Sequence, residues 1–241
     1  MDKKRLTKKR GYDIVVFDCD STLTKIEGVD WLAKLKGKGK EVEALTALAM
    51  NGHLLFHRAL QQRLKMIKPT KKELRWLGEQ YIENRLPDAR EVITCLQEAG
   101  KKVYIVTGGY REAVEILAEY LGIKKGNVFA LNLRFGKNEN YLGPDWENPL
   151  SQHDGKREIL RQISQQGKTI FVGDGATDLE AENVVDLFVG FGGVARRSIV
   201  RKNAPVFLLK PTLKPILNLA LGQFIKRSKN VITKARAFDI S

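Results

Sequence analysis

The sequence predicts an α/β protein built on a doubly wound parallel sheet, with a small helical domain inserted after the first strand. Residues 14–17 form a continuous apolar run, which is typical of a parallel strand that is buried on both faces. After residue 85, short apolar runs alternate with helical patterns, as they do when helices cover a parallel sheet. Between these parts, residues 30–84 show helical periodicity without a strand.

The expected elements follow one another in chain order. In the inserted segment, Thr70 follows Pro69 and is the expected N-cap of a helix that begins near Lys71. An added hairpin is expected from residues 131–135 and the residues around Tyr141. The remaining strands are expected at residues 103–106, 169–172, 187–189 and 206–209, and the helices near residues 88–99, 110–121, 155–166, 176–184 and 194–202.

The chain of 241 residues is long enough for one large domain that carries a smaller insert. We divide it into a core of residues 11–29 and 85–209 and a helical cap of residues 30–84. A basic N-terminal tail, residues 1–10, precedes the core, and a basic, partly helical extension, residues 210–241, follows it.

The formal net charge of +14 is concentrated at the two ends of the chain. Residues 1–11 carry +5 and residues 210–241 carry +6, which leaves +3 for the body. We therefore expect no specific nucleic-acid partner, because basic tails are most often solvated. Weak contact of the tails with anionic lipid or nucleic acid is the alternative. Residues 213–228 fit either a final helix docked on the sheet or a membrane-surface or partner helix.

Apolar stretches and cysteines bear on location. No apolar stretch approaches the ~20 residues of a membrane span, and the N-terminus lacks the apolar segment of a secretory signal. Two cysteines, Cys19 and Cys95, make no disulfide framework, so a reducing cytoplasm is the expected location. Because side chains alternate along an extended segment, Cys19 is expected to point away from its acidic neighbours.

Carboxylates follow two of the expected strands. Asp18 and Asp20 come directly after the first strand, and Asp174 and Asp178 come after the strand at 169–172. In an open α/β sheet, ligands bind just beyond the carboxyl ends of the strands, so these side chains are expected to meet there. Oxygen-only ligation beside a phosphate favours Mg²⁺, which indicates a magnesium-dependent enzyme that transfers phosphate.

Two further positions fit the binding of phosphate. Thr107, Gly108 and Gly109 follow the strand at 103–106 and precede a helix, and a hydroxyl with bare N–H groups there suits a phosphate oxygen. Lys156 stands near the start of a later helix, between the threonine and the second acidic pair. Neither position alone indicates a phosphate site. Their order along the chain, between the two acidic pairs, supports that interpretation.

These pieces, in this order, resemble the haloacid dehalogenase (HAD) superfamily of phosphohydrolases, whose core is Rossmann-like. The resemblance covers roughly residues 11–209 and is closer still to the phosphoserine phosphatases. The superfamily pattern is matched by Asp18-Cys19-Asp20-Ser21-Thr22, Thr107, Lys156 and Gly173-Asp174-Gly175-Ala176-Thr177-Asp178. The closer resemblance adds Phe17, Glu27-Gly28, Gly108-Gly109 and Gly190-Phe191-Gly192-Gly193. Thr107 is a departure, since serine is more usual in that branch.

The resemblance implies a role for each matched residue. Asp18 would be the nucleophile, and Asp20 the general acid and base. Mg²⁺ would be held by Asp18, Asp174 and the backbone carbonyl of Asp20. Phosphoryl oxygens would be bound by Thr107, the N–H of Gly108 and Lys156. Around these, Asp178 would orient Lys156 or a metal-bound water, and Thr22 would lie beside the metal site.

The resemblance also implies a substrate pocket. Glu27 would bind an ammonium group and Arg63 a carboxylate, while Met50 and Phe56 would form an apolar wall. Further pocket residues would be Gly109, Thr177 and Arg197. Without the resemblance, Arg63 fits a solvated helix face, and Met50 and Phe56 fit ordinary cap core.

The expected activity is hydrolysis of O-phospho-L-serine to L-serine and phosphate through an aspartyl-phosphate, the last step of serine biosynthesis. The first alternative is a phosphatase or phosphotransferase of the same fold that acts on another small phosphorylated metabolite. The second is a protein that binds polyanions or membranes through its basic tails. The expected partner is a small-molecule substrate, and the chain is expected to be a monomer or a homodimer.

Overall fold

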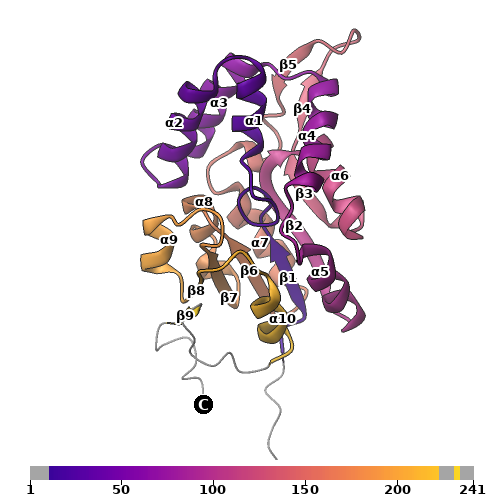
Figure 1. Ribbon diagram of the computed structural model, residues 1–241, viewed down its shortest axis with the longest axis vertical. Helices are drawn as coiled ribbons and strands as arrows, with labels where there is room; N and C mark the ends of the chain where they lie inside the picture. The colour runs from indigo at the N-terminus through magenta and orange to yellow at the C-terminus, as the bar shows by residue number, and fades with distance from the viewer. Residues whose placement is uncertain (1–10, 223–230, 234–241) are drawn as a thin grey trace, which may run out of the picture.

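A seven-stranded sheet forms the centre of the protein, as a computed structural model shows for residues 11–222 and 231–233 (Figure 1). Its strand order is β3-β2-β1-β6-β7-β8-β9, and every neighbouring pair is parallel except β8 with β9. The doubly wound parallel sheet is therefore confirmed. The strands are β1 (Ile14–Phe17), β2 (Lys102–Tyr110), β3 (Val128–Leu131), β6 (Thr169–Gly173), β7 (Leu187–Phe191), β8 (Val206–Leu208) and β9 (Val231–Thr233).

β1 lies in the middle of the sheet, where the direction of strand order reverses. It pairs with β2 on one side and with β6 on the other. From β1 the chain builds β2 and β3 outward in one direction, then returns to build β6, β7 and β8 in the other. Such a switch point opens a crevice at the carboxyl ends of the central strands.

The side chains of β1 alternate between two hydrophobic clusters, one on each face of the sheet. Val15 and Phe17 belong to the cluster that includes α5, α6 and α10, whereas Ile14 and Val16 belong to the cluster that includes α7 and α9. All four are fully buried, which explains their continuous apolar run. The helices of these layers are α5 (Ala89–Glu98), α6 (Arg111–Leu121), α7 (Gly155–Ser164), α9 (Ser198–Asn203) and α10 (Lys214–Ala220).

Four helices follow β1 and lie together at one end of the molecule (Figure 1). They are α1 (Gly28–Leu35), α2 (Gly39–Met50), α3 (Phe56–Ile67) and α4 (Lys71–Glu83). The N-cap prediction for α4 is confirmed, since Thr70 accepts a hydrogen bond from the N–H of Glu73 and Glu73 accepts one from the N–H of Thr70. Gly78 lets α4 approach α6, because a Cβ there would lie 2.6 Å from Ile116.

Two helix predictions need correction. A single helix at 176–184 is wrong: α8 (Ala176–Leu179) is followed by a separate 3-10 turn, Glu182–Val184. Val184 and Val185 pack against the hydrophobic cluster on one face of the sheet as the chain returns to β7. The helix expected near 194–202 begins only at Ser198, because Arg197 has an extended backbone.

The predicted hairpin is confirmed with a later start. β4 (Leu133–Phe135) and β5 (Tyr141–Pro144) form a two-stranded antiparallel sheet. Leu131, where the hairpin was expected to begin, is the last residue of β3 and pairs with Tyr110. Two short 3-10 turns, Lys125–Asn127 and Pro149–Ser151, precede β3 and α7.

The C-terminal part packs onto the core more closely than a solvated tail would. Ile216 and Leu219 of α10 are buried, and Asp88, beside α5, accepts a hydrogen bond from the N–H of Leu213. The helix expected over 213–228 ends at Ala220, because Gly222 adopts a left-handed backbone with φ of 71°. The rest of that segment lies outside the described residues. β9, on the sheet edge, was not predicted.

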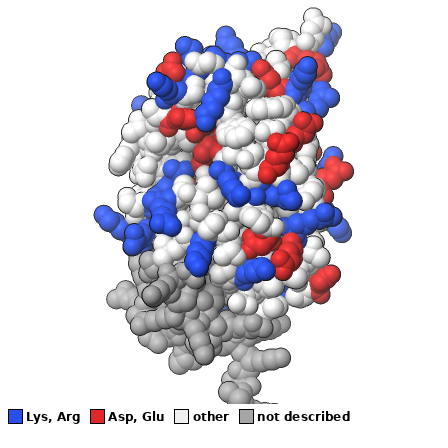
Figure 2. All heavy atoms as spheres, in the orientation of Figure 1, with Lys and Arg blue, Asp and Glu red and all other residues white. Residues whose placement is uncertain are grey.

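Basic and acidic side chains alternate over the face of the body shown in Figure 2, which agrees with the small net charge of residues 12–209. In the part of the chain that the structure describes, no helix is both long enough and apolar enough to span a bilayer.

Candidate active site

Three buried carboxylates meet at the switch point of the sheet. Asp18 follows β1 and Asp174 follows β6, and the backbone N–H of Asp18 donates to the carbonyl of Val172 on the neighbouring strand. Asp178 lies on α8, one helical turn beyond Asp174. One oxygen from each carboxylate lies within 4.8 Å of the others, although these groups are 95% or more buried. The fold therefore brings together acidic residues separated by 160 positions of sequence.

Lys156 supplies a positive charge to this group from the start of α7. Its ammonium lies 2.8 Å from Oδ1 of Asp18 and 2.5 Å from Oδ1 of Asp178. Burial opposes the charged form, but the charges of Asp178 and Asp18 outweigh it and raise the pKa of Lys156. The protonated lysine thus ties the start of α7 to the residue that follows β1 and to α8.

Two of the carboxylates have raised pKa values. Burial, followed by the charge of Asp18, raises the pKa of Asp178 to about 6. Burial raises the pKa of Asp174 well above its ordinary value, and Arg197 opposes this shift. Like-charged groups in a buried site favour the entry of a cation. Oxygen donors at this spacing fit a divalent metal ion, and Asp18 and Asp174 are the residues placed to bind it.

Asp20 is not part of this group of three carboxylates and has hydrogen-bond partners of its own. Its Oδ1 accepts hydrogen bonds from the N–H of Gly28, at 2.7 Å, and from the hydroxyl of Tyr81, at 2.8 Å. Its Oδ2 faces Gly109, where a Cβ would lie 3.1 Å away. Burial, then the charges of Glu27 and Asp18, raise the pKa of Asp20 to about 8. A carboxyl group with this pKa is mostly protonated at neutral pH and can donate a proton.

The end of β2 presents backbone and hydroxyl groups to the same space. The strand was expected to end at Val106 but continues to Tyr110, with a shift of register between these two residues. Thr107 is buried, and its Oγ1 accepts a hydrogen bond from the N–H of Gly109 at 3.1 Å. Gly108 lies under the ring of Phe56, since a Cβ on it would come within 2.7 Å of that ring. A residue with a side chain at 108 would push Phe56 away from the site.

Glu27 and Arg197 pair with each other rather than standing alone. Arg197 donates from Nη2 to Glu27 Oε1 and from Nε to Asp174 Oδ2, each at 2.8 Å. The hydroxyl of Ser21 donates to the same oxygen of Glu27 at 2.8 Å. One guanidinium therefore connects the acidic group at the sheet with the acid expected to bind an ammonium. This pairing was not predicted from the sequence.

Arg63 is buried, so the interpretation that placed it on a solvated helix face is wrong. It is 3% exposed, donates from Nη1 to Oγ1 of Thr46 at 3.2 Å, and lies over the ring of Phe56 at 5.6 Å. The hydroxyl of Thr46 in turn donates to Asp30 at 2.6 Å. These contacts fix the guanidinium on the inner face of α3.

Core and cap residues line one common cavity. Of the residues singled out from the sequence, it contains Asp18, Asp20, Glu27, Met50, Phe56, Arg63, Thr107, Gly108, Gly109, Lys156, Asp174 and Thr177. Three others are not in its lining: Thr22, which lies 3.5 Å from Asp174 through its hydroxyl, Asp178 and Arg197. Cys19 packs in the core, as alternation predicts.

Sequence reasoning missed Tyr81 and Tyr110, which also line the cavity. Tyr110 directly follows Thr107, Gly108 and Gly109, so its place in the chain could have predicted that it lines the site. Tyr81 had no such signal, because an aromatic residue on an amphipathic helix reads as ordinary core.

The fold and this site define a hydrolase of the haloacid dehalogenase type, and the family model for haloacid dehalogenase-like hydrolases matches residues 12–183. The phosphoserine phosphatase of Bos taurus is 38% identical over 199 residues, which cover 81% of this chain and 88% of the relative. The chloroplastic enzyme of that name from Arabidopsis thaliana is 38% identical over 217 residues, 86% of this chain and 72% of its own. The chain belongs to the phosphoserine phosphatase family.

Solved structures agree. A phospho-aspartyl intermediate analogue of phosphoserine phosphatase is similar to this chain with a TM-score of 0.74 at 28% identity, over 86% of this chain and 98% of its own. A substrate-bound phosphoserine phosphatase complex has a TM-score of 0.73 at 29% identity, over 88% and 98%. These likenesses favour a phosphoserine phosphatase over both alternatives considered from the sequence.

Proposed function

We propose that this chain hydrolyses O-phospho-L-serine to L-serine and phosphate, with Asp18 as the nucleophile and Mg²⁺ as the cofactor. The observation that carries this proposal is one cavity that holds Asp18 and Asp20 from the core together with Arg63 from the cap. The likeness to phosphoserine phosphatases supports the choice of substrate.

The proposed reaction has two steps. A carboxylate oxygen of Asp18 attacks phosphorus, and the bond from phosphorus to the serine oxygen breaks. Asp20 gives its proton to the departing oxygen, which is consistent with a pKa of about 8. In the second step Asp20, now ionised, removes a proton from water, which attacks the phosphorus and releases phosphate from Asp18.

Fixed groups of the chain would stabilise the charge of the phosphoryl group. Lys156 already contacts Asp18 at 2.8 Å, so its ammonium would lie close to the oxygens of a phosphoryl group bound to Asp18. The hydroxyl of Thr107 and the N–H of Gly108 are assigned to the other oxygens. Mg²⁺, held by Asp18, Asp174 and the backbone carbonyl of Asp20, would offset negative charge between nucleophile and phosphate. Asp178 would keep Lys156 in place, and Thr22 would support Asp174.

The serine part of the substrate would be bound at its two charges. Arg63 would bind the carboxylate, because a guanidinium suits bidentate pairing with a carboxylate. Glu27 would bind the ammonium of the substrate. That ammonium would donate to Oε1 of Glu27, the oxygen that accepts a hydrogen bond from Arg197 in this structure. Met50 and Phe56 would exclude water, with Gly109, Thr177 and Arg197 around them.

One experiment tests the proposal: release of phosphate from a panel of small phosphomonoesters in the presence of Mg²⁺. Phosphoserine should be the preferred substrate of the wild type. Asp18→Asn should show no turnover, and it should carry no covalently bound phosphate after mixing with phosphoserine that is radioactive at phosphorus. Preference for a different phosphomonoester would show that phosphoserine is not the substrate. Turnover by Asp18→Asn would show that Asp18 is not the nucleophile. The activity would place the protein at the step that releases serine; the cytoplasmic location stays a prediction.

A further inference from the structure

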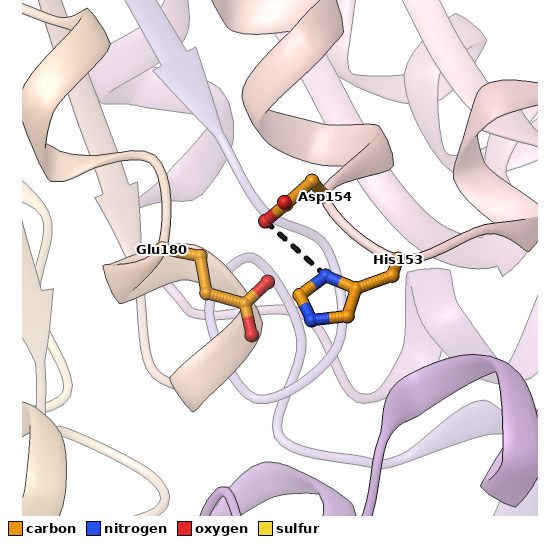
Figure 3. Close-up of side chains that lie close together, drawn as sticks. All are labelled: His153, Asp154 and Glu180. Atoms are coloured by element: carbon orange, nitrogen blue, oxygen red, sulfur yellow. Dashed lines mark ion pairs between the residues drawn. The ribbon is translucent and has the colours of Figure 1, made fainter.

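A second group of metal-binding side chains lies outside the acidic cluster, near the mouth of the active site. His153 and Asp154 stand just before α7, and Glu180 directly follows α8. Figure 3 shows the three side chains turned toward one another, with Nδ1 of His153 lying 3.2 Å from Oδ1 of Asp154. One donor atom of each lies within 4.8 Å of the others. The tertiary fold creates this juxtaposition, because Glu180 comes from a separate element.

The charges of the group favour a cation. Two carboxylates, those of Asp154 and Glu180, share the group with the single imidazole of His153. A dication bound between them would remove the repulsion of the two acids.

The donor atoms indicate which metals fit. The buried cluster at Asp18 offers only oxygen, which suits Mg²⁺. The second group offers one imidazole nitrogen and two carboxylate oxygens, a set that zinc and similar transition metals bind, with water in the remaining position. Donors around such an ion stand roughly 3.4 Å apart, as bond lengths near 2.1 Å require. His153 and Asp154 are each half-exposed, at 49%, so their side chains are free to close the remaining gap.

We propose that His153, Asp154 and Glu180 form a second metal site that takes a transition-metal dication such as Zn²⁺. The site borders a cavity that these three residues share with Lys156 and Thr177. The ion would join the segment that leads to Lys156 with the end of α8. It would therefore stabilise the two elements whose side chains, Lys156 and Asp178, form an ion pair. This inference concerns residues that have no part in the proposed phosphate transfer.

The test is a titration of the full chain with Co²⁺ and Zn²⁺ in the presence of excess Mg²⁺. The wild type should bind one equivalent more than His153→Asn or Glu180→Gln, with a visible Co²⁺ band that these variants lose. Removal of a ligand should weaken binding at least 10- to 100-fold, the range seen when even an outer partner of a ligand is lost. His53→Asn is the matched control, since His53 lies between α2 and α3, and it should bind as the wild type does.

The chain has three histidines, which allows a second measurement. In NMR spectra of the imidazoles, the first equivalent of Zn²⁺ should move the signals of His153 and leave those of His53 and His57 in place. Thermal unfolding of the metal-free variants checks that each is folded. Equal binding by the wild type and a folded His153→Asn, or movement of His53 or His57 first, would overturn the proposal. Because the readouts are binding and NMR signals, failure here is distinguishable from failure of the phosphatase assignment.

Discussion

The hydroxyl of Tyr81 donates a hydrogen bond of 2.8 Å to Oδ1 of Asp20, joining residues 61 positions apart. Tyr81 belongs to α4 of the cap, whereas Asp20 belongs to the loop after β1. The N–H of Gly28 donates to the same oxygen, so Oδ1 is held from two sides and Oδ2 is left facing Gly109. The cap thus fixes which oxygen of the acid faces the end of β2 at Gly109.

Replacing Tyr81 by Phe should lower kcat about 10-fold and leave KM nearly unchanged. The change removes one hydrogen bond to Asp20, the proposed general acid, and such a bond is worth roughly 1.4 kcal/mol in the transition state. Steady-state kinetics with phosphoserine measures both constants. Tyr120→Phe, on α6 and outside the cavity lining, is the matched control and should keep wild-type values. A rise in KM with an unchanged kcat would show that Tyr81 only shapes the pocket.

The alkaline limb of the pH profile of kcat should follow the environment of Asp20. Turnover is expected to fall as pH rises through the pKa of about 8, because the ionised carboxyl can no longer donate. The charge of Glu27 raises this pKa and the hydrogen bond from Tyr81 lowers it. Glu27→Gln should therefore move the limb to lower pH and Tyr81→Phe to higher pH. If the alkaline limb moved in the same direction in Glu27→Gln and in Tyr81→Phe, the assignment of Asp20 as the group that titrates would be wrong.

The metal-free protein should lose stability as pH rises from about 4 to 6. The pKa of Asp178 is raised from 3.8 to about 6, so the folded protein holds this proton more tightly than the unfolded chain. The resulting stabilisation is complete below the unfolded pKa and is lost as pH rises through the folded one. Urea denaturation in a chelator, compared with Asp178→Asn, measures this slope. If the difference in the free energy of unfolding between the two proteins did not change with pH across this range, the prediction would be wrong. Added Mg²⁺ should raise the Tm of the wild type at pH 7.

Gly28→Ala should disturb the same contact from the other side. A Cβ at residue 28 would overlap the hydroxyl and ring of Tyr81. We expect a lower Tm and a kcat that falls by at least as much as in Tyr81→Phe, with the two changes less than additive when combined. Gly126→Ala is the control, because a Cβ there meets open space. Full additivity would mean that the two residues act independently.

Arg63→Met should impair binding of the substrate carboxylate alone. KM for phosphoserine should rise about 10- to 100-fold, since a charge-assisted pair is worth roughly 1.5–3 kcal/mol. Turnover of phosphoethanolamine, which has the ammonium but no carboxylate, should change little. Arg63→Lys should recover part of the loss. An equal loss on both substrates, with the fold intact by circular dichroism, would place Arg63 in cap packing instead.

Most of the core could be predicted because its signals are local. β1, β6 and β7 are apolar runs that are buried on both faces, and each acidic residue that follows β1 and β6 stands directly beside its strand. Parallel topology then brings Asp18 and Asp174 to one edge without further information.

The remaining features depend on how distant elements pack. The contact of Tyr81 with Asp20 depends on the docking of α4, and the pairing of Arg197 with Glu27 depends on a loop after β7. α8 ends early because the following residues lead back to the sheet, which periodicity alone does not distinguish from a longer helix. β9 is only three residues long and pairs antiparallel with β8, so its short apolar pattern did not mark it.

The position of β1 has a consequence for how the protein is made. Its partners in the sheet begin at residues 102 and 169, so both neighbours of this strand are synthesised long after it. Until β6 emerges from the ribosome, Ile14–Phe17 cannot complete its hydrogen bonds, whereas α1, α2 and α3 can already contact one another. The newborn chain therefore carries an apolar strand that waits for more than half of the sequence, and that interval is when it is most exposed to aggregation.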